Sequence, residues 1–281
     1  MTHQFSPLVN IVLLSLLASL GTGLGGLIAV IRKPGKRMYG LLMGITAGVM
    51  ICLSFLDLVN EAWNLAGPWT ATIGFAIGAT FMFLLDHFAP HIRFGEKEVR
   101  GFQPEISNIS SDCPHYGRRR FGRRRWQSQN LDMRLVNTGL LLAVGITLHN
   151  LPEGIAVGAG YLHNPQFGLF IALAIMLHNI PEGIATALPL CKGGVCRWDA
   201  FRIAFFSGFA EPVGALIASL FLVTFQKLVP GALAFAGGVM VFITLDELIP
   251  TAREFGHEHY VAIGIILGSL FVFILSGIMG V

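Results

Sequence analysis

Apolar segments long enough to cross a membrane alternate with short polar ones along most of the chain. Crossing roughly 30 Å of hydrocarbon takes a helix of about 20 predominantly apolar residues. The pattern predicts eight such helices, at residues 8–31, 39–63, 68–88, 136–160, 166–190, 201–224, 230–251 and 260–280. We therefore expect an all-α integral membrane protein with eight transmembrane helices.

One long polar stretch divides this pattern. Residues 90–135 are rich in Arg, Ser and Asn, which predicts a flexible basic loop. The loop separates helices 1–3, within residues 1–89, from helices 4–5, within residues 136–190, where two copies of a polar motif lie. Helices 6–8 follow within residues 191–281.

The composition supports the bilayer as the solvent of this chain. Of its 281 residues, 54% are hydrophobic and only 12% are charged. An average soluble domain carries roughly 25% charged residues. A soluble core of this length could not bury so much apolar surface, which favours the bilayer over water as the solvent.

The 19 Lys and Arg residues predict how the chain is oriented. With the loops assigned alternately to two sides, all of them except Lys227 fall on one side. Basic loops stay in the cytoplasm, so both termini are predicted to be extracytoplasmic in a multi-pass protein of the inner or plasma membrane. The arginine run at 118–125 would also suit a nucleic acid. In a membrane protein we favour contact with anionic lipid and expect no nucleic-acid partner.

Two internal repeats lie in helices that run in opposite directions. Residues 149–156 and 178–185 share the pattern His-Asn-x-Pro-Glu-Gly-Ile-Ala, each near the middle of a helix. More faintly, residues 48–62 align with residues 238–252 at a constant offset of 190 residues. Together they predict an inverted 3+2+3 repeat, in which helices 1–3 recur as helices 6–8 around a central pair. Inverted repeats with a site at the membrane midplane are typical of transporters.

Ionisable residues cluster at membrane depth in the predicted helices 4, 5 and 6. They are His149, Glu153, His178, Glu182 and Glu211. Such side chains are unfavourable in hydrocarbon and usually functional, and a bound dication would compensate them. A His and a Glu four residues apart share one helix face, so each pair can point at one ion. Imidazole with carboxylate suits Zn, Fe, Mn or Co better than Ca or Mg.

The other residues of the motif fit a site that must release its ion. Asn150 and Asn179 add neutral amide oxygens, which differ from the Cys-rich ligand sets of structural zinc sites. The motif prolines each free one backbone carbonyl and kink the helix beside the ligands. We expect Gly154 and Gly183 to let the two motif helices approach each other closely.

The paired motifs, the glutamate within residues 207–214 and the Asp-Glu-Leu-x-Pro sequence at 246–250 resemble the ZIP (zinc-iron permease) family of metal-ion transporters, closest to its bacterial ZupT-type and GufA-type branches. The resemblance covers essentially the whole chain. It implies Zn²⁺ as the transported substrate, with Fe²⁺, Mn²⁺, Co²⁺ and Cd²⁺ as further substrates. It also implies that helices 1, 4, 5 and 6 move against the others.

The family further implies a centre for two ions. The first ion would be held by both His-Glu pairs, with Met50 as a soft ligand. The second would be held by Asn150, Asn179 and Glu211, with the two motif glutamates bridging. The full ligand set implied in this way is His149, Asn150, Glu153, His178, Asn179, Glu182, Glu211 and Met50.

Three classes of function fit a buried cluster of His and Glu. We predict a transporter that moves divalent metal into the cytoplasm, and no enzyme. The alternative is a membrane-embedded metalloenzyme, a hydrolase or hydroxylase, which needs an open coordination position and does not explain ligands doubled by an inverted repeat. A metal sensor would be expected to carry a signalling domain. Two packed core histidines would be a purely structural alternative, which the doubled motif disfavours. Proton coupling and a homodimer stay open.

Overall fold

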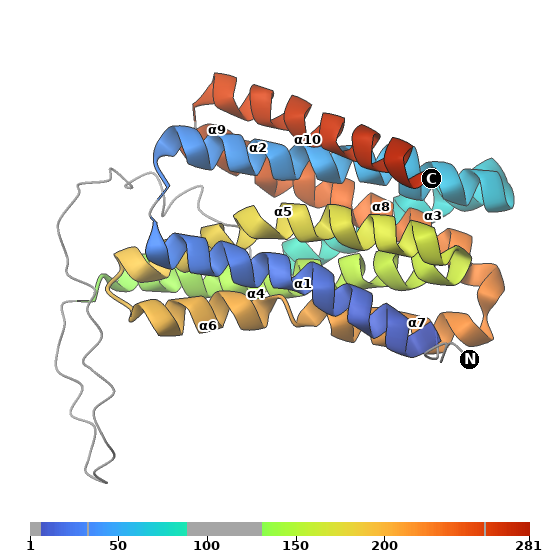
Figure 1. The fold of residues 1–281 in the computed structure, drawn as a ribbon, viewed down its shortest axis with the longest axis horizontal. Helices are drawn as coiled ribbons and strands as arrows, with labels where there is room; N and C mark the ends of the chain where they lie inside the picture. Colours follow the sequence, from blue (N-terminus) through green and yellow to red (C-terminus); the bar gives the residue numbers. More distant parts are fainter. Residues whose placement is uncertain (1–6, 33, 89–130, 256) are drawn as a thin grey trace, which may run out of the picture.

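The computed structural model describes residues 7–32, 34–88, 131–255 and 257–281, whose regular structure is helical throughout (Figure 1). The predicted loop at 90–135 lies outside the described residues up to residue 130. The α-helices are α1 (Pro7–Ile31), α2 (Lys36–Cys52), α3 (Asn60–Phe88), α4 (Met133–His163), α5 (Pro165–Lys192), α6 (Arg197–Ser207), α7 (Ala210–Thr224), α8 (Val229–Ile243), α9 (Ile249–Phe255) and α10 (Glu258–Met279). The π-helices η1 (Leu53–Val59) and η4 (Thr244–Leu248) and the 3-10 helix η3 (Gln226–Leu228) join some of them.

Seven helical stretches of the described residues are long and apolar enough to cross a membrane. Each matches one predicted transmembrane helix, except the stretch Lys36–His87, which has 52 residues and covers two. Within it, Gly67 has φ 81° and ψ 174°, a backbone conformation that glycine adopts readily and other residues rarely do. Gly67 therefore interrupts α3.

The chain turns back at Gly67, as contacts along α8 show. A Cβ atom on Gly237 would meet the carbonyl oxygen of Ser54 at 3.3 Å, and one on Gly238 would meet that of Phe75 at 2.1 Å. Residues 54 and 75 therefore lie at the same level, although a straight helix would separate them by about 30 Å. The stretch consists of two antiparallel segments.

The helices pack as two bundles that lie side by side (Figure 1). The first bundle contains α1, α4, α5, α6 and α7, in which α1 packs along α5 and α4 along α7. The second bundle contains α2, α3, α8, α9 and α10, in which α3 packs along α8 and α2 along α10. The bundles meet mainly where α4 contacts α8 and where α2 contacts α5.

Glycines let the backbones touch inside each bundle. In the first, a Cβ atom on Gly183 of α5 would lie 2.0 Å from the carbonyl oxygen of Thr22 on α1. In the second, a Cβ atom on Gly268 of α10 would lie 2.2 Å from that of Ile45 on α2. Both distances are too short for any side chain. Such close approach of small residues is what drives helix association in lipid, where burial of apolar side chains gives little advantage.

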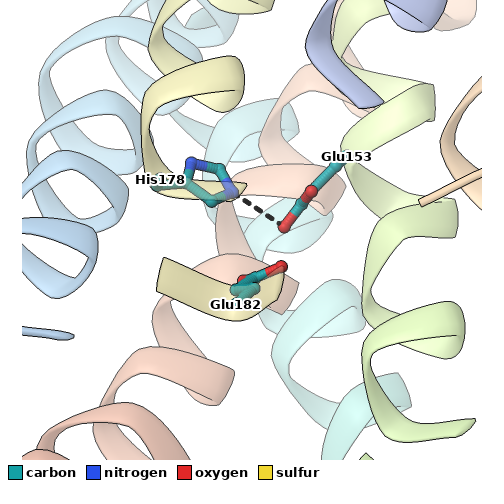
Figure 2. A group of neighbouring side chains, drawn as sticks. All are labelled: Glu153, His178 and Glu182. Carbon is teal, nitrogen blue, oxygen red and sulfur yellow. Dashed lines mark hydrogen bonds and ion pairs between the residues drawn. The ribbon is translucent and has the colours of Figure 1, made fainter. Parts of the chain in front are cut away.

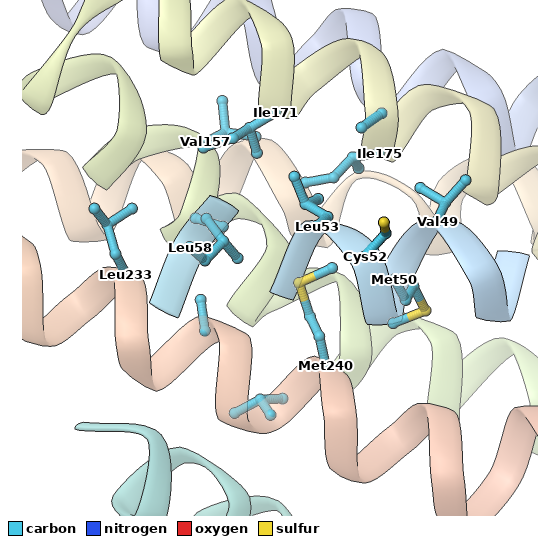
Figure 3. Packing of buried hydrophobic residues seen from close by; sticks show 14 of the residues in the cluster. Val49, Met50, Cys52, Leu53, Leu58, Val157, Ile171, Ile175, Leu233 and Met240 are labelled. Carbon is cyan, nitrogen blue, oxygen red and sulfur yellow. The ribbon is translucent and has the colours of Figure 1, made fainter. Parts of the chain in front are cut away.

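Aliphatic side chains fill the space between the bundles (Figure 3). Leu53 and Leu58 of η1 and Met240 of α8 face Val157 of α4 and Ile175 of α5, and all of them are buried. Branched aliphatic side chains and methionine pack without directional bonds and adapt to changes in their neighbours. The contact between the bundles is thus of a different kind from the backbone contacts inside them.

The two π-helices occupy matching positions of the fainter repeat. Adding 190 to residues 54–58 of η1 gives residues 244–248, which form η4. A π turn holds about one residue more than an α turn, so it rotates the side chains that follow by roughly 100°. The apolar pattern of the sequence did not predict these turns, which are frequent at functional sites.

Candidate metal centre

Two carboxylates and one imidazole converge between α4 and α5 of the first bundle (Figure 2). Glu153 extends from α4, and His178 and Glu182 extend from α5. One ligand atom of each lies within 4.8 Å of the others, and all three side chains are buried. His178 Nε2 lies 3.1 Å from Glu153 Oε1. Ligands about 2.0–2.2 Å from a tetrahedral ion lie roughly 3.3–3.6 Å apart, so the spacing suits one ion.

The turn between α4 and α5 sets these side chains face to face. Asn164, between His163 and Pro165, is extended, with φ −150° and ψ 123°. A residue before proline avoids the helical conformation, so α4 stops here and α5 returns beside it. Because His178 and Glu182 are one turn apart, they share the face of α5 that looks toward α4.

The cluster holds polar atoms without hydrogen-bond partners. Within the described residues, Glu153 Oε2, Glu182 Oε2 and His178 Nδ1 are buried and accept or donate no hydrogen bond. Leaving a buried charge uncompensated is unfavourable by several kcal/mol. A divalent ion coordinated by these side chains would supply the compensation, and their mixed nitrogen and oxygen ligands suit Zn²⁺ and similar ions.

A second polar group connects α4, α5 and α7. Asn179 Nδ2 donates to Glu211 Oε2 at 3.0 Å and to the carbonyl oxygen of Ala18 at 3.2 Å. Asn150 Nδ2 donates to the carbonyl oxygen of Ser207 at 3.2 Å. The amide oxygens of both asparagines and Glu211 Oε1 are buried without a hydrogen-bond partner among the described residues. Three oxygen acceptors are therefore available to a second cation.

A break between α6 and α7 brings Glu211 to this group. The predicted transmembrane helix at 201–224 is interrupted, because α6 ends at Ser207 and α7 begins at Ala210. Pro212 lies in the first turn of α7, where its missing N–H is no loss. The break leaves the Ser207 carbonyl free to accept from Asn150. It also puts Glu211 at a helix N-terminus, which favours an anion.

Gly154 and Gly183 make close helix contacts, but with helices other than the two motif helices that the sequence predicted. A Cβ atom on Gly154 would lie 2.0 Å from the carbonyl oxygen of Glu211 on α7, and one on Gly183 would lie 2.0 Å from that of Thr22 on α1. The prediction that they join the two motif helices to each other is therefore wrong. Each motif helix has its ligands on one face and its glycine on another. The contact at Gly154 still serves the site, because it places Glu211 beside the turn that carries Glu153.

His149 lies one turn before Glu153 on α4, but it faces the second bundle. Its Nε2 atom is 3.6 Å from Glu247 Oε2 of η4. The sequence predicted that both His-Glu pairs point at one ion. The structure brings Glu153, His178 and Glu182 together and gives His149 a different carboxylate. The position of Glu247 in the 238–252 repeat was the available signal for this partner.

Met50 of α2 is completely buried near the contact between the bundles (Figure 3). Its sulfur accepts a hydrogen bond from Thr244 Oγ1 at 3.6 Å, and it belongs to the same hydrophobic cluster as Val49 and Met240. Met50 and Met240 are equivalent residues of the repeat. This is ordinary core packing for methionine, and the role of Met50 as a ligand stays a prediction.

Further polar contacts join the bundles, and the sequence did not predict them. Thr46 Oγ1 of α2 donates to the backbone oxygen of His178 at 3.2 Å. Glu61 Oε1 of α3 lies 2.8 Å from His163 Nε2 of α4. The partners lie far apart in the chain, so no spacing pattern relates them.

Comparison with known proteins assigns the chain to a family. Residues 71–279 match the family described as ZIP zinc transporter. The chain is 38% identical to the zinc transporter ZupT of Chlorobium luteolum over 91% of its length and 92% of the relative's. It is 38% identical to that of Akkermansia muciniphila over 94% and 95%, and 36% identical to that of Clostridium perfringens over 91% of both. The chain therefore belongs to the ZIP zinc transporter family.

Proposed function

We propose that this protein carries zinc and related divalent transition-metal ions across a membrane into the cytoplasm, through the buried centre of the first bundle. The observation that carries the proposal is the convergence of Glu153, His178 and Glu182 within 4.8 Å, with buried atoms that lack hydrogen-bond partners. The family and the named relatives are zinc transporters, which favours transport over the metalloenzyme alternative. Mixed nitrogen and oxygen ligands also suit Fe²⁺, Mn²⁺, Co²⁺ and Cd²⁺ as substrates.

The chain crosses the membrane eight times in an inverted 3+2+3 arrangement. Two observations support this proposal. The reversal at Gly67 divides the longest helical stretch into two antiparallel segments. The two π-helices recur 190 residues apart, in helices that the repeat relates.

Both termini face away from the cytoplasm, and the protein lies in the inner or plasma membrane. The asymmetry of Lys and Arg supports this orientation. Arg32 follows α1 and Lys36 begins α2, and Lys192 ends α5 and Arg197 begins α6. These turns and the start of α4 share one end of the molecule, because successive helices alternate in direction.

The centre binds two ions. The first is held by Glu153, His178 and Glu182. His149 joins its coordination by turning away from Glu247, and Met50 joins it from the second bundle. The second is held by Asn150, Asn179 and Glu211, whose unpartnered oxygens support this assignment. The hydrogen bond from Asn179 to Glu211 must open for the second ion to bind.

Transport occurs by movement of the first bundle against the second. Glycine contacts between backbones make each bundle a rigid unit. The surface between them is filled mainly by aliphatic side chains, which can exchange partners, so that only a few polar contacts have to break (Figure 3). The convergent ligands all lie in the first bundle, so its movement would carry the ion with it.

Uptake of radioactive zinc into proteoliposomes tests the proposal. The variant combines His149→Ala with Glu182→Ala. The matched control combines His259→Ala with Glu258→Ala, an exposed pair of the same residue types on α10. We expect the site variant to lose uptake and the control to keep it. Competition by the other metals would rank the substrates. Unchanged uptake by the site variant would show that the centre is misplaced.

A further inference from the structure

A third pairing of imidazole with carboxylate lies away from the metal centre, where the two bundles meet at one end of the molecule. His163 is the last residue of α4, and Glu61 is the second residue of α3. His163 Nε2 and Glu61 Oε1 are 2.8 Å apart. Their side chains are 24% and 29% exposed, whereas those of His178 and Glu153 are 0% and 1% exposed. An ion could therefore reach the outer pair from water.

The pair lies at the end predicted to be extracytoplasmic. Helix α4 has 31 residues and begins near the basic loop, so His163 is about 45 Å from its start. His163 follows Glu153 by ten residues on the same helix, which places it about 15 Å from the centre along the helix axis. On the opposite bundle, Asp57 of η1 precedes Glu61 by about one turn. Asp57 Oδ2 is buried, with no hydrogen-bond partner among the described residues.

Both side chains of the pair are fixed in position by the local fold. His163 is followed by an extended Asn164 and by Pro165, and its ring meets Phe167 edge to face, with centroids 5.9 Å apart. Glu61 lies in the first turn of α3, directly after η1, whose extra residue rotates it by roughly 100° compared with a continuous α-helix. The spacing of the pair does not depend on a flexible loop.

We propose that His163 and Glu61 form an outer capture site, which binds the divalent metal ion before it enters the centre. The inference rests on the proposed function, since it assumes that metal is the cargo. Imidazole nitrogen and carboxylate oxygen are zinc ligands. Two ligands of one tetrahedral ion lie roughly 3.3 Å apart, so the pair must open by about 0.5 Å and give up its shared proton. Water completes the shell, which makes the site weak enough to pass its ion inward to Asp57.

Binding of Co²⁺ to the purified full-length protein separates this site from the centre. In the background Glu153→Gln, Glu182→Gln and Glu211→Gln, both ion positions of the centre are disabled, and we expect residual binding of about one weakly held ion. Adding His163→Gln or Glu61→Gln should abolish that residual binding. Adding His259→Gln, an exposed histidine at the other end of the molecule, should leave it unchanged.

Zinc uptake gives the second measurement. With the centre intact, His163→Gln should raise the KM about tenfold and leave the maximal rate nearly unchanged. A merely structural tie between the bundles would instead change the maximal rate, with no effect on residual Co²⁺ binding, and that result would overturn the proposal. Residual binding unaffected by both outer variants would also overturn it. Failure of the proposed function looks different, because the centre variants would then keep full uptake.

Discussion

The two bundles bury different kinds of side chain, although glycines hold both together. The buried histidines and glutamates of the described residues all lie in the first bundle, and they are His149, Glu153, His178, Glu182 and Glu211. The buried polar residues of the second bundle are Thr46, Ser54, Asp86 and Thr244. Ionisable groups that are unfavourable in hydrocarbon are thus concentrated in one unit.

If the bundles move as proposed, this difference separates two tasks. A site that keeps its geometry during movement needs all its ligands on one rigid unit. The unit it moves against needs a surface with few directional bonds, so that contacts can exchange at little cost. The first bundle meets the first requirement and the aliphatic surface of η1 and α8 meets the second (Figure 3).

The largest effect is expected from a methyl group added between helices of one bundle. Gly183→Ala would place Cβ 2.0 Å from the Thr22 carbonyl, and Gly268→Ala would place it 2.2 Å from the Ile45 carbonyl. Each should lower the free energy of unfolding by about 1–3 kcal/mol or more, because the backbones must separate. Gly183→Ala should also weaken zinc binding, since it displaces the helix that carries Glu182. Thermal unfolding and zinc titration in detergent measure both.

The control for this comparison is Gly277→Ala on α10, where nothing lies within 4 Å of an added Cβ. There the substitution should leave the unfolding temperature unchanged or raise it, since alanine favours a helix by about 1 kcal/mol over glycine. If Gly268→Ala weakened zinc binding as much as Gly183→Ala, the site would depend on both bundles, and the division of tasks would be wrong.

The fold could be predicted from the sequence wherever it follows from composition and periodicity. Apolar length gave the helices, and the doubled motif gave the convergence of Glu153, His178 and Glu182. These features depend on residues close in the chain or related by an exact repeat. The sequence signals for the break between α6 and α7 were Gly208 and Pro212. This combination permits a helix break but does not require one.

Other features could not be predicted because they depend on helix rotation. The partner of His149 is decided by which way α4 faces, and a difference of one residue turns a side chain by about 100°. The π-helix η4 adds such a rotation before Glu247. The partner of Gly154 depends in the same way on which neighbour its face meets. Apolar patterns in a bilayer do not distinguish these faces, because lipid and protein are both apolar.

A smaller effect is expected from the contact that joins the centre to the second bundle. His149→Gln and Glu247→Gln should each raise the KM for zinc uptake about tenfold, as loss of a partner beside a metal site commonly does. The double variant should raise the KM little more than either single variant does, because the two side chains are 3.6 Å apart and act together. Purely additive effects would show that they act separately. His257→Gln, which is exposed, serves as the control.

The last prediction concerns pH and again distinguishes the bundles. Metal binds the neutral imidazole and the ionised carboxylates, so protons compete with it, and binding weakens as the pH falls. Histidine in model peptides titrates near pH 6.5, and displacement of one proton weakens binding about tenfold for each pH unit below that value. We expect the zinc affinity of the wild-type protein to decline between about pH 7 and 5.

His178→Gln should bind zinc more weakly at neutral pH and lose part of this decline, whereas Thr46→Val in the second bundle should keep the wild-type profile. Zinc titrations at a series of pH values measure it. An affinity that stays flat over this range would contradict a histidine ligand, whatever the effect of His178→Gln on uptake.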